Sequence, residues 1–336
     1  MSCPCTIHAR LWRAGLGLLL AAVMGTAHGQ VAPHEFGRFG SDDMLLVVAP
    51  HPDDETLCCA GAIQSARAAG ARVAIVWITS GDGFELDAHV VEHRLFTGTQ
   101  GLLELARLRM HEAGRAAQLL GVAPAERFFL GYPDGGIAYL VYDREETTYR
   151  SVHTGAEAVP YAEALRPGAP YTRVNLERDL RTVIDRVQPT WVLAPTPLDL
   201  HADHRATGVL VIRTMDVLRQ SSRVRYWIVH GGIGWPWPRG LHSEETLVPP
   251  ARARALPWEE LALVPVERTQ KENAIRTYET QMRLTSSFML SFVKRNEIYS
   301  AVPYIGPIMS ALIAQEIPVI AASDDYSAAE RRGALK

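Results

Sequence analysis

The chain has few cysteines, no internal repeat and no long apolar run beyond its first 29 residues. Four cysteines occur in 336 residues, and two of them, Cys58 and Cys59, are adjacent. Adjacent cysteines rarely pair with each other, so we expect no disulfide scaffold and interpret these two as packing residues of an apolar helix. Because no later stretch reaches about 18 apolar residues, the remainder of the chain is not expected to cross a membrane.

The chain also lacks an excess of positive charge and a phosphate-binding glycine loop. Its formal net charge is −3. This mild acidic balance disfavours nucleic acid as the main partner. The turn after the first predicted strand carries no G-x-G-x-x-G pattern, and its carboxylates would repel a pyrophosphate. The missing glycine pattern and these carboxylates both argue against a nucleotide-binding Rossmann protein.

The N-terminal stretch has the pattern of a secretory signal peptide. Arg10 and Arg13 precede an apolar run over residues 14–25, and small residues at 27–29 have the spacing of a cleavage site. The pattern predicts a signal peptide over residues 1–29 and export to the periplasm or the medium. The alternative is an N-terminal anchor, although the run is short for a bilayer. Removing the segment takes away two arginines and no acid, which brings the formal charge to −5.

The rest of the chain alternates strand and helix patterns. This order predicts a parallel sheet with right-handed crossovers, and so a Rossmann-like, three-layer αβα fold with a mainly parallel sheet. We expect one domain over residues 30–323, insertions near 85–101 and 131–170, and a loose polar tail at 324–336. The strands are expected at 44–49, 72–79, 127–130, 191–194 and 224–230, and the helices at 54–69, 102–120, 175–187, from 204 to about 219, and at 267–289.

A dense polar cluster follows the first predicted strand. The apolar run over residues 44–49 reads as a buried parallel strand, and the sequence His51-Pro52-Asp53-Asp54-Glu55 follows its end. Open α/β sheets bind ligands at this edge. One imidazole and three carboxylates suit a metal ion and a general base. The alternative is a helix start, with Asp53 or Asp54 as the cap.

A second cluster, His201-Ala202-Asp203-His204, follows the fourth predicted strand. Both clusters therefore lie at the same edge of a parallel sheet, and residues three apart in a first helical turn share a face. His51 with Asp54, and His201 with His204, can each converge on one point. Three nitrogen or oxygen ligands and an open position make a catalytic zinc site. The alternative is a cap by Asp203 beside two surface histidines.

The pair of motifs resembles the zinc-dependent deacetylase family that includes the LmbE-like proteins, the PIG-L N-acetylglucosaminyl deacetylases and the mycothiol-pathway deacetylase. The resemblance is good over residues 44–219 and thin elsewhere. Further matching segments are Thr79-Ser80-Gly81-Asp82-Gly83, Arg109-Met110-His111-Glu112, Leu130-Gly131-Tyr132-Pro133-Asp134-Gly135, and Lys271 with Ala274, Tyr278 and Gln281.

The resemblance implies a zinc-dependent active site with one Zn²⁺ per chain. His51, Asp54 and His204 would bind the metal. Asp53 would be the general base for the attacking water, and His201 would donate a hydrogen bond or proton to the oxyanion or the leaving amine. Zinc is the expected metal for such donors, and another divalent ion is the alternative.

The resemblance places other residues around this centre. Asp203 and Glu55 would orient a histidine or cap a helix. Arg109, Asp82 and Asp134 would bind substrate. The alternatives are an ordinary exposed helix arginine for Arg109 and turn residues for the two aspartates.

The implied reaction is hydrolysis of an N-acyl group, expected to be N-acetyl, from an amino sugar or a glycoconjugate that contains N-acetylglucosamine. The partner would be a small-molecule or oligosaccharide substrate. Two alternatives are a metal-dependent esterase or phosphoesterase, and an exported sugar-binding protein without activity. Trp235 and Trp237 are either an aromatic platform for a sugar or a packed proline turn, and the oligomeric state stays open.

Overall fold

The structure is a computed structural model that describes residues 1, 36–83, 98–142 and 147–304. All described residues except Met1 belong to one unit of the chain, residues 33–336. The predicted signal peptide (beyond Met1) and the predicted polar tail lie outside the described residues, as does most of the predicted insertion at 85–101.

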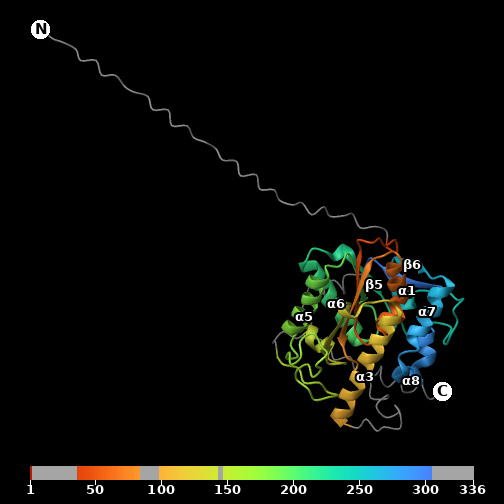
Figure 1. Cartoon of the computed structure of the whole chain (residues 1–336), viewed down its shortest axis with the longest axis horizontal. Coiled ribbons are helices and arrows are strands. Elements are labelled where there is room, and N and C mark those ends of the chain that lie inside the picture. Colours follow the sequence, from red (N-terminus) through yellow and green to blue (C-terminus); the bar gives the residue numbers. More distant parts are fainter. Residues whose placement is uncertain (2–35, 84–97, 143–146, 305–336) are drawn as a thin grey trace. The chain divides into compact units, whose positions relative to one another are not determined.

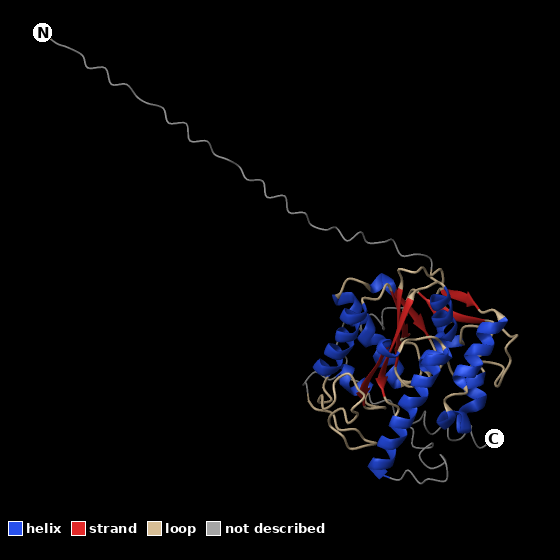
Figure 2. Cartoon of the chain, in the orientation of Figure 1, coloured by secondary structure: helices blue, strands red, loops and turns tan. Residues whose placement is uncertain are grey.

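A mixed sheet lies between the helices of this unit (Figure 2). It has seven strands in the order β3-β2-β1-β4-β5-β7-β6. The first five strands are parallel, and β7 runs antiparallel to β5 and β6. This confirms the predicted three-layer α/β fold with a mainly parallel sheet. The strands are β1 (Met44–Ala49), β2 (Arg72–Thr79), β3 (Arg127–Tyr132), β4 (Trp191–Pro195), β5 (Val224–Trp227), β6 (Trp258–Ala262) and β7 (Asn296–Ser300).

The strand order reverses between β1 and β4. From β1 the chain moves outward through β2 to β3, whereas β4 pairs with the other side of β1 and leads on to β5. Such a switch point opens a crevice at the carboxyl ends of the strands, where α/β folds bind ligands. The loops that follow β1 and β4 carry the two predicted clusters, and the topology therefore brings them together.

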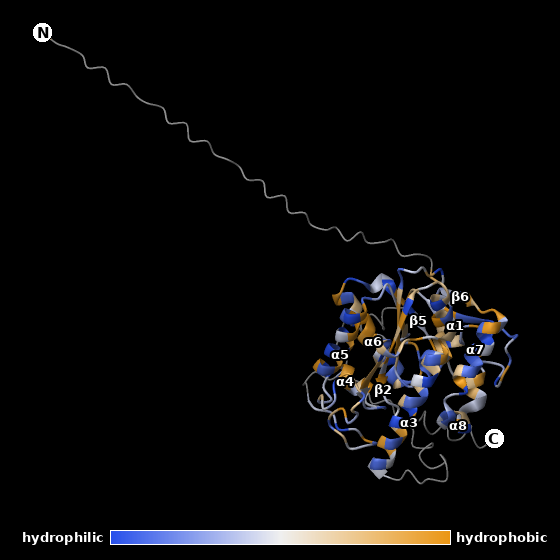
Figure 3. Ribbon diagram, viewed as in Figure 1, coloured by the Kyte–Doolittle hydropathy of each residue, from blue (hydrophilic) through white to orange (hydrophobic). Residues whose placement is uncertain are grey.

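Helices cover both faces of the sheet (Figure 1). On one face lie α4 (Ile137–Tyr142), α5 (Arg173–Val187) and α6 (Ala202–Val217). On the other lie α1 (Asp54–Ala68), α7 (Pro265–Ile275) and α8 (Glu279–Leu290), and α3 (Gly98–Leu119) contributes side chains to both cores. The strands are mostly hydrophobic and the helices show both colours (Figure 3), as expected for helices that bury one stripe.

The core explains why β1 reads as an uninterrupted apolar run. Leu45, Val47 and Ala49 pack into one core, and Met44, Leu46 and Val48 pack into the other. All six side chains are buried. Because both faces of a parallel sheet are covered, alternation of polar and apolar residues is lost.

Four elements of the structure differ from the prediction. Neither the edge strand β6 nor its neighbour β7 was among the predicted strands. The helix expected over 267–289 is two helices, because Tyr278 leaves the helical region at the junction (φ −82°, ψ 65°) and donates a hydrogen bond to Glu55. Helix α3 begins at Gly98, inside the segment expected to be a loop insertion. Apolar spacing alone does not reveal these tertiary constraints.

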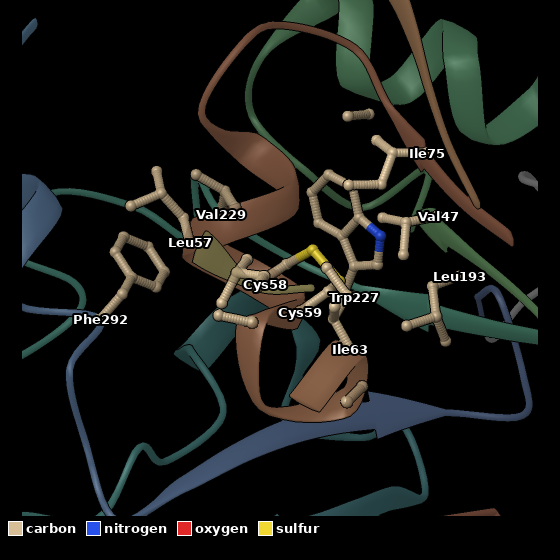
Figure 4. Packing of buried hydrophobic residues seen from close by; sticks show 14 of the residues in the cluster. Val47, Leu57, Cys58, Cys59, Ile63, Ile75, Leu193, Trp227, Val229 and Phe292 are labelled. Atoms are coloured by element: carbon tan, nitrogen blue, oxygen red, sulfur yellow. A yellow bond between two sulfur atoms is a disulfide. The ribbon is translucent and has the colours of Figure 1, made fainter. Parts of the chain in front are cut away.

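The expectation that Cys58 and Cys59 stay unpaired is wrong. They lie in α1, as predicted, but are joined by a disulfide. Figure 4 shows the bond among the side chains of Val47, Ile75 and Trp227. Whether two adjacent cysteines can form a disulfide bond depends on the local backbone geometry. The sequence pattern does not specify that geometry.

Candidate metal centre and active site

The loop after β1 is held in an unusual backbone conformation. Asp53 has φ 129°, a region that non-glycine residues rarely adopt, at a cost of about 1–3 kcal/mol. Its carbonyl oxygen accepts the amides of Thr56 and Leu57, both at 2.9 Å, which starts α1. Its side chain makes no capping hydrogen bond. The carboxylate therefore does not serve as the helix cap that was the alternative interpretation.

Three donor atoms converge at the switch point. His51 Nδ1 lies 3.3 Å from Asp54 Oδ2, His204 Nε2 lies 3.2 Å from the same oxygen, and the two ring nitrogens are 3.3 Å apart. Tetrahedral coordination at zinc–ligand distances near 2.0–2.1 Å puts neighbouring ligand atoms about 3.3 Å apart. The donor set and its spacing thus fit a zinc ion or a similar divalent metal.

Two aspartates hold the ring nitrogens that face away from this triangle. Asp203 Oδ2 lies 3.3 Å from His51 Nε2 and also accepts the Gly135 amide at 2.7 Å. Asp199 Oδ2 lies 3.2 Å from His204 Nδ1. Carboxylates in such positions fix the tautomer and orientation of metal-binding histidines. Asp199 was missed from the sequence, although it stands two residues before His201 in the same motif.

The surrounding carboxylates favour positive charge at the centre. Burial lowers the pKa of His204, but Asp54 and Asp199 outweigh it and raise that pKa to about 9. Burial likewise opposes the charged form of His51, yet Asp134 and the other neighbouring carboxylates raise its pKa well above its ordinary value. Carboxylates that favour protonated histidines also favour a metal cation in place of those protons.

His201 and His230 lie beside the triangle. The ring of His201 is centred 4.7 Å from that of His51, and its Nδ1 accepts the Asp203 amide at 3.3 Å. Its proton is therefore on Nε2. Burial, followed by the charges on His51 and His204, lowers the pKa of His201 to about 3, so it is a neutral donor.

His230 was not predicted as a site residue. Its ring is centred 4.8 Å from that of His204 and stacks on Phe288 at 5.6 Å. With Asp54 and His204 it forms another group whose ligand atoms lie within 4.8 Å of one another. The strand predicted at 224–230 included His230, but β5 ends at Trp227. His230 therefore lies in the segment after the strand, at the same edge of the sheet as the other two clusters.

The three residues assigned to substrate are not equivalent. Asp134 Oδ1 lies 3.3 Å from His51 Nε2. Arg109 is buried rather than exposed, and its Nη1 donates to Gly81 O at 2.7 Å and lies 4.0 Å from Asp134 Oδ2. Asp82 is fully buried and accepts the Asp134 amide at 2.9 Å and the Tyr161 hydroxyl at 3.0 Å. Asp134 thus contacts His51 on the side away from the triangle, Arg109 lies beside Asp134, and Asp82 supports the loop that carries Asp134.

Glu55 points away from the donor triangle. Its carboxylate accepts hydrogen bonds from Trp77 Nε1 at 2.8 Å and Thr56 Oγ1 at 2.7 Å, and from the Tyr278 hydroxyl. Burial raises its pKa. Glu55 therefore ties the loop to β2 and to the junction between α7 and α8.

The two tryptophans of the proline-rich loop have different surroundings. Trp235 is 9% exposed, and its Nε1 donates to Val248 O at 2.8 Å. Trp237 is 74% exposed. The packed-turn interpretation thus describes Trp235, and Trp237 presents an aromatic face at the surface.

Within the described ranges, no helix combines the length and apolar character needed to cross a membrane.

Comparison with known proteins agrees with this geometry. Residues 46–215 match the family PIG-L, described as GlcNAc-PI de-N-acetylase. The chain is 31% identical over 209 residues to a 1D-myo-inositol 2-acetamido-2-deoxy-alpha-D-glucopyranoside deacetylase of Nakamurella multipartita. That match covers 59% of this chain and 58% of the relative.

Comparison with solved structures gives two deacetylases, and the first has a similar fold. The A40926 pseudoaglycone deacetylase is similar with a TM-score of 0.52 and 16% identity, over 78% of this chain and 98% of that one. The N,N'-diacetylchitobiose deacetylase of Pyrococcus horikoshii gives a TM-score of 0.49 and 19% identity, over 80% and 88% of the two chains. The family match spans both clusters and half of the sequence, and this chain therefore belongs to the PIG-L family.

Proposed function

We propose that this protein is a zinc-dependent N-deacetylase that removes an acetyl group from an N-acetylglucosamine-type amino sugar. The observation that carries the proposal is the triangle of His51 Nδ1, Asp54 Oδ2 and His204 Nε2, with sides of 3.2–3.3 Å. The family match and the named activity of the relative, which acts on an acetamido-glucopyranoside, support the substrate class.

Different residues of the chain would have different roles in amide hydrolysis. A divalent metal held by the triangle would lower the pKa of a water molecule and polarise the acyl oxygen. Asp53 would take the proton from the attacking water as general base. His201 Nε2–H would donate a hydrogen bond to the oxygen that becomes negative as the tetrahedral carbon forms. The proton taken up by Asp53 would then pass to the leaving nitrogen.

Substrate would lie across the Asp134 side of the triangle. Arg109 and Asp134 offer a donor and an acceptor of opposite charge 4.0 Å apart. Sugar hydroxyls both donate and accept hydrogen bonds, so they can satisfy such a pair. In this arrangement the amide would lie over the triangle and the sugar ring would lie towards α3.

Release of acetate from a substrate panel tests the reaction class. We expect N-acetylglucosamine, N,N'-diacetylchitobiose or an N-acetylglucosaminyl inositol to yield acetate and free amine in equal amounts. p-Nitrophenyl acetate is the ester substrate and bis(p-nitrophenyl) phosphate is the phosphodiester substrate for comparison. Hydrolysis of either compound without hydrolysis of any amide would contradict the proposal and favour an esterase or phosphoesterase.

A further inference from the structure

A buried glutamine from the far end of the chain contacts Asp53. Gln281 lies in the first turn of α8 and is 2% exposed. Its Nε2 lies 2.7 Å from Asp53 Oδ2 and 2.7 Å from Pro52 O. Both neighbours are acceptors, so the amide orientation is fixed and its two N–H groups are both used.

The helix that carries Gln281 is itself held by buried contacts. Glu112 of α3 accepts the Thr280 amide at 3.0 Å and the Thr280 hydroxyl at 2.6 Å. The Tyr278 hydroxyl bonds to Glu55. Gln281 thus reaches Asp53 from a support that is fixed on two sides, and such a support is what precise placement of a catalytic group needs.

The Asp53 side chain needs a contact from another part of the chain, because its own segment does little to fix its position. Its backbone is in a disfavoured region, and its side chain makes no bond to the helix it precedes. The N–H donor of Gln281 holds Oδ2 of Asp53 in place, which leaves Oδ1 to face the attacking water.

We propose that Gln281 is a positioning residue, which fixes the side chain of Asp53 as the general base through this hydrogen bond. The inference rests on the proposed function for the role of Asp53, but the contact it invokes is independent of the substrate.

Replacing Gln281 by methionine keeps the length of the side chain and removes both donors. We expect kcat to fall by about 10- to 100-fold, since small misplacements of a reacting group cost rates of this order. KM should change by less than about 2-fold, because Gln281 contacts Asp53 rather than substrate. Gln281→Glu should be at least as damaging, since it places an oxygen against two acceptors.

A double-mutant cycle separates positioning from general structural damage. In an Asp53→Asn background no base remains to be positioned, so Gln281→Met should change the residual rate by less than about 2-fold. Gln64→Met is the matched control, because Gln64 Nε2 also donates to two backbone carbonyls, at Ala60 and Glu267, away from Asp53. It should leave kcat at the wild-type value. An equal loss from Gln281→Met in both backgrounds, or no loss in the wild-type background, would overturn the inference.

Crystal structures of Gln281→Met and Gln64→Met give a readout that does not need turnover. We expect the Asp53 carboxylate to be displaced in the first variant and unmoved in the second. If the wild-type protein hydrolyses no member of the panel, the proposed function fails, whereas this comparison still decides the role of Gln281. An unmoved Asp53 carboxylate in Gln281→Met would overturn that role.

Discussion

The variant Asp53→Asn is expected to lose kcat by about 10²- to 10⁴-fold, the usual contribution of general acid–base catalysis, and to keep its metal. Asparagine has the size of aspartate and can still accept the hydrogen bond from Gln281, but its amide cannot take up a proton. None of the three donor atoms of the triangle belongs to Asp53. Steady-state kinetics on the best acetamido substrate, together with metal content per chain, measure both effects.

His204→Ala is the companion variant, since it removes one corner of the triangle and should lose both metal and activity. Asp42→Asn, at an exposed position, should match the wild-type protein in both. A kcat for Asp53→Asn within about 3-fold of wild type would show that another group acts as the base. Loss of metal from Asp53→Asn would instead place Asp53 among the ligands.

Lys271→Met is expected to lower the free energy of unfolding by about 3–5 kcal/mol, the cost of leaving one member of a buried ion pair uncompensated. Lys271 Nζ lies 2.7 Å from Glu297 Oε1, and both side chains are at most 1% exposed. Lys271 also donates to Leu57 O at 2.8 Å. Glu297 accepts the amides of Gly61 and Ala62. The variant would thus remove the positive charge that pairs with the buried Glu297 carboxylate. This carboxylate holds α1 against β7.

Chemical denaturation curves of the purified protein measure this change. Arg276→Met is the control, because Arg276 pairs with Glu272 at 2.7 Å on the exposed side of α7, where such pairs contribute about 0–1 kcal/mol. The double variant Lys271→Met/Glu297→Gln should regain part of the loss. A loss for Lys271→Met no larger than that for Arg276→Met would contradict the account of this pair.

Much of the fold and of the candidate metal centre could be predicted from the sequence, because both follow from buried parallel strands. Such strands are apolar throughout, as β1 is, and their carboxyl ends lie at one edge of the sheet. Placing His51, Asp54 and His204 together required only that β1 and β4 be neighbours, which the structure shows. The roles of these residues remain proposals that the variants above test.

The elements that were missed depend on contacts between distant parts of the chain. Strand β7 buries Asn296 and Glu297, residues that disfavour a strand prediction. They are accommodated because Asn296 bonds to the backbone of Leu247 and Glu297 pairs with Lys271. Strand β6 is a half-exposed edge strand with two glutamates, so its pattern is weak.

Contacts between distant parts of the chain also explain why the roles of the residues that support the site could not be predicted. Gln281 reaches Asp53 from a part of the chain that is far from it in the sequence. Asp199 lies only five residues before His204, but it is also held by residues that are distant in the sequence. Asp199 accepts hydrogen bonds from the amides of Val229 and His230 in addition to its contact with His204. The resemblance to the family singled out Gln281 without a role, and only the structure shows that it reaches Asp53.

One divalent metal, held by His51, Asp54 and His204, should be required for deacetylation. The most direct test of this requirement is acetate release by the same protein sample as purified, after removal of metal by a chelator, and after stepwise addition of zinc, with metal content measured at each stage. We predict that release stops with the metal removed and returns in proportion to added zinc up to one ion per chain. Undiminished acetate release from metal-free protein would contradict the account.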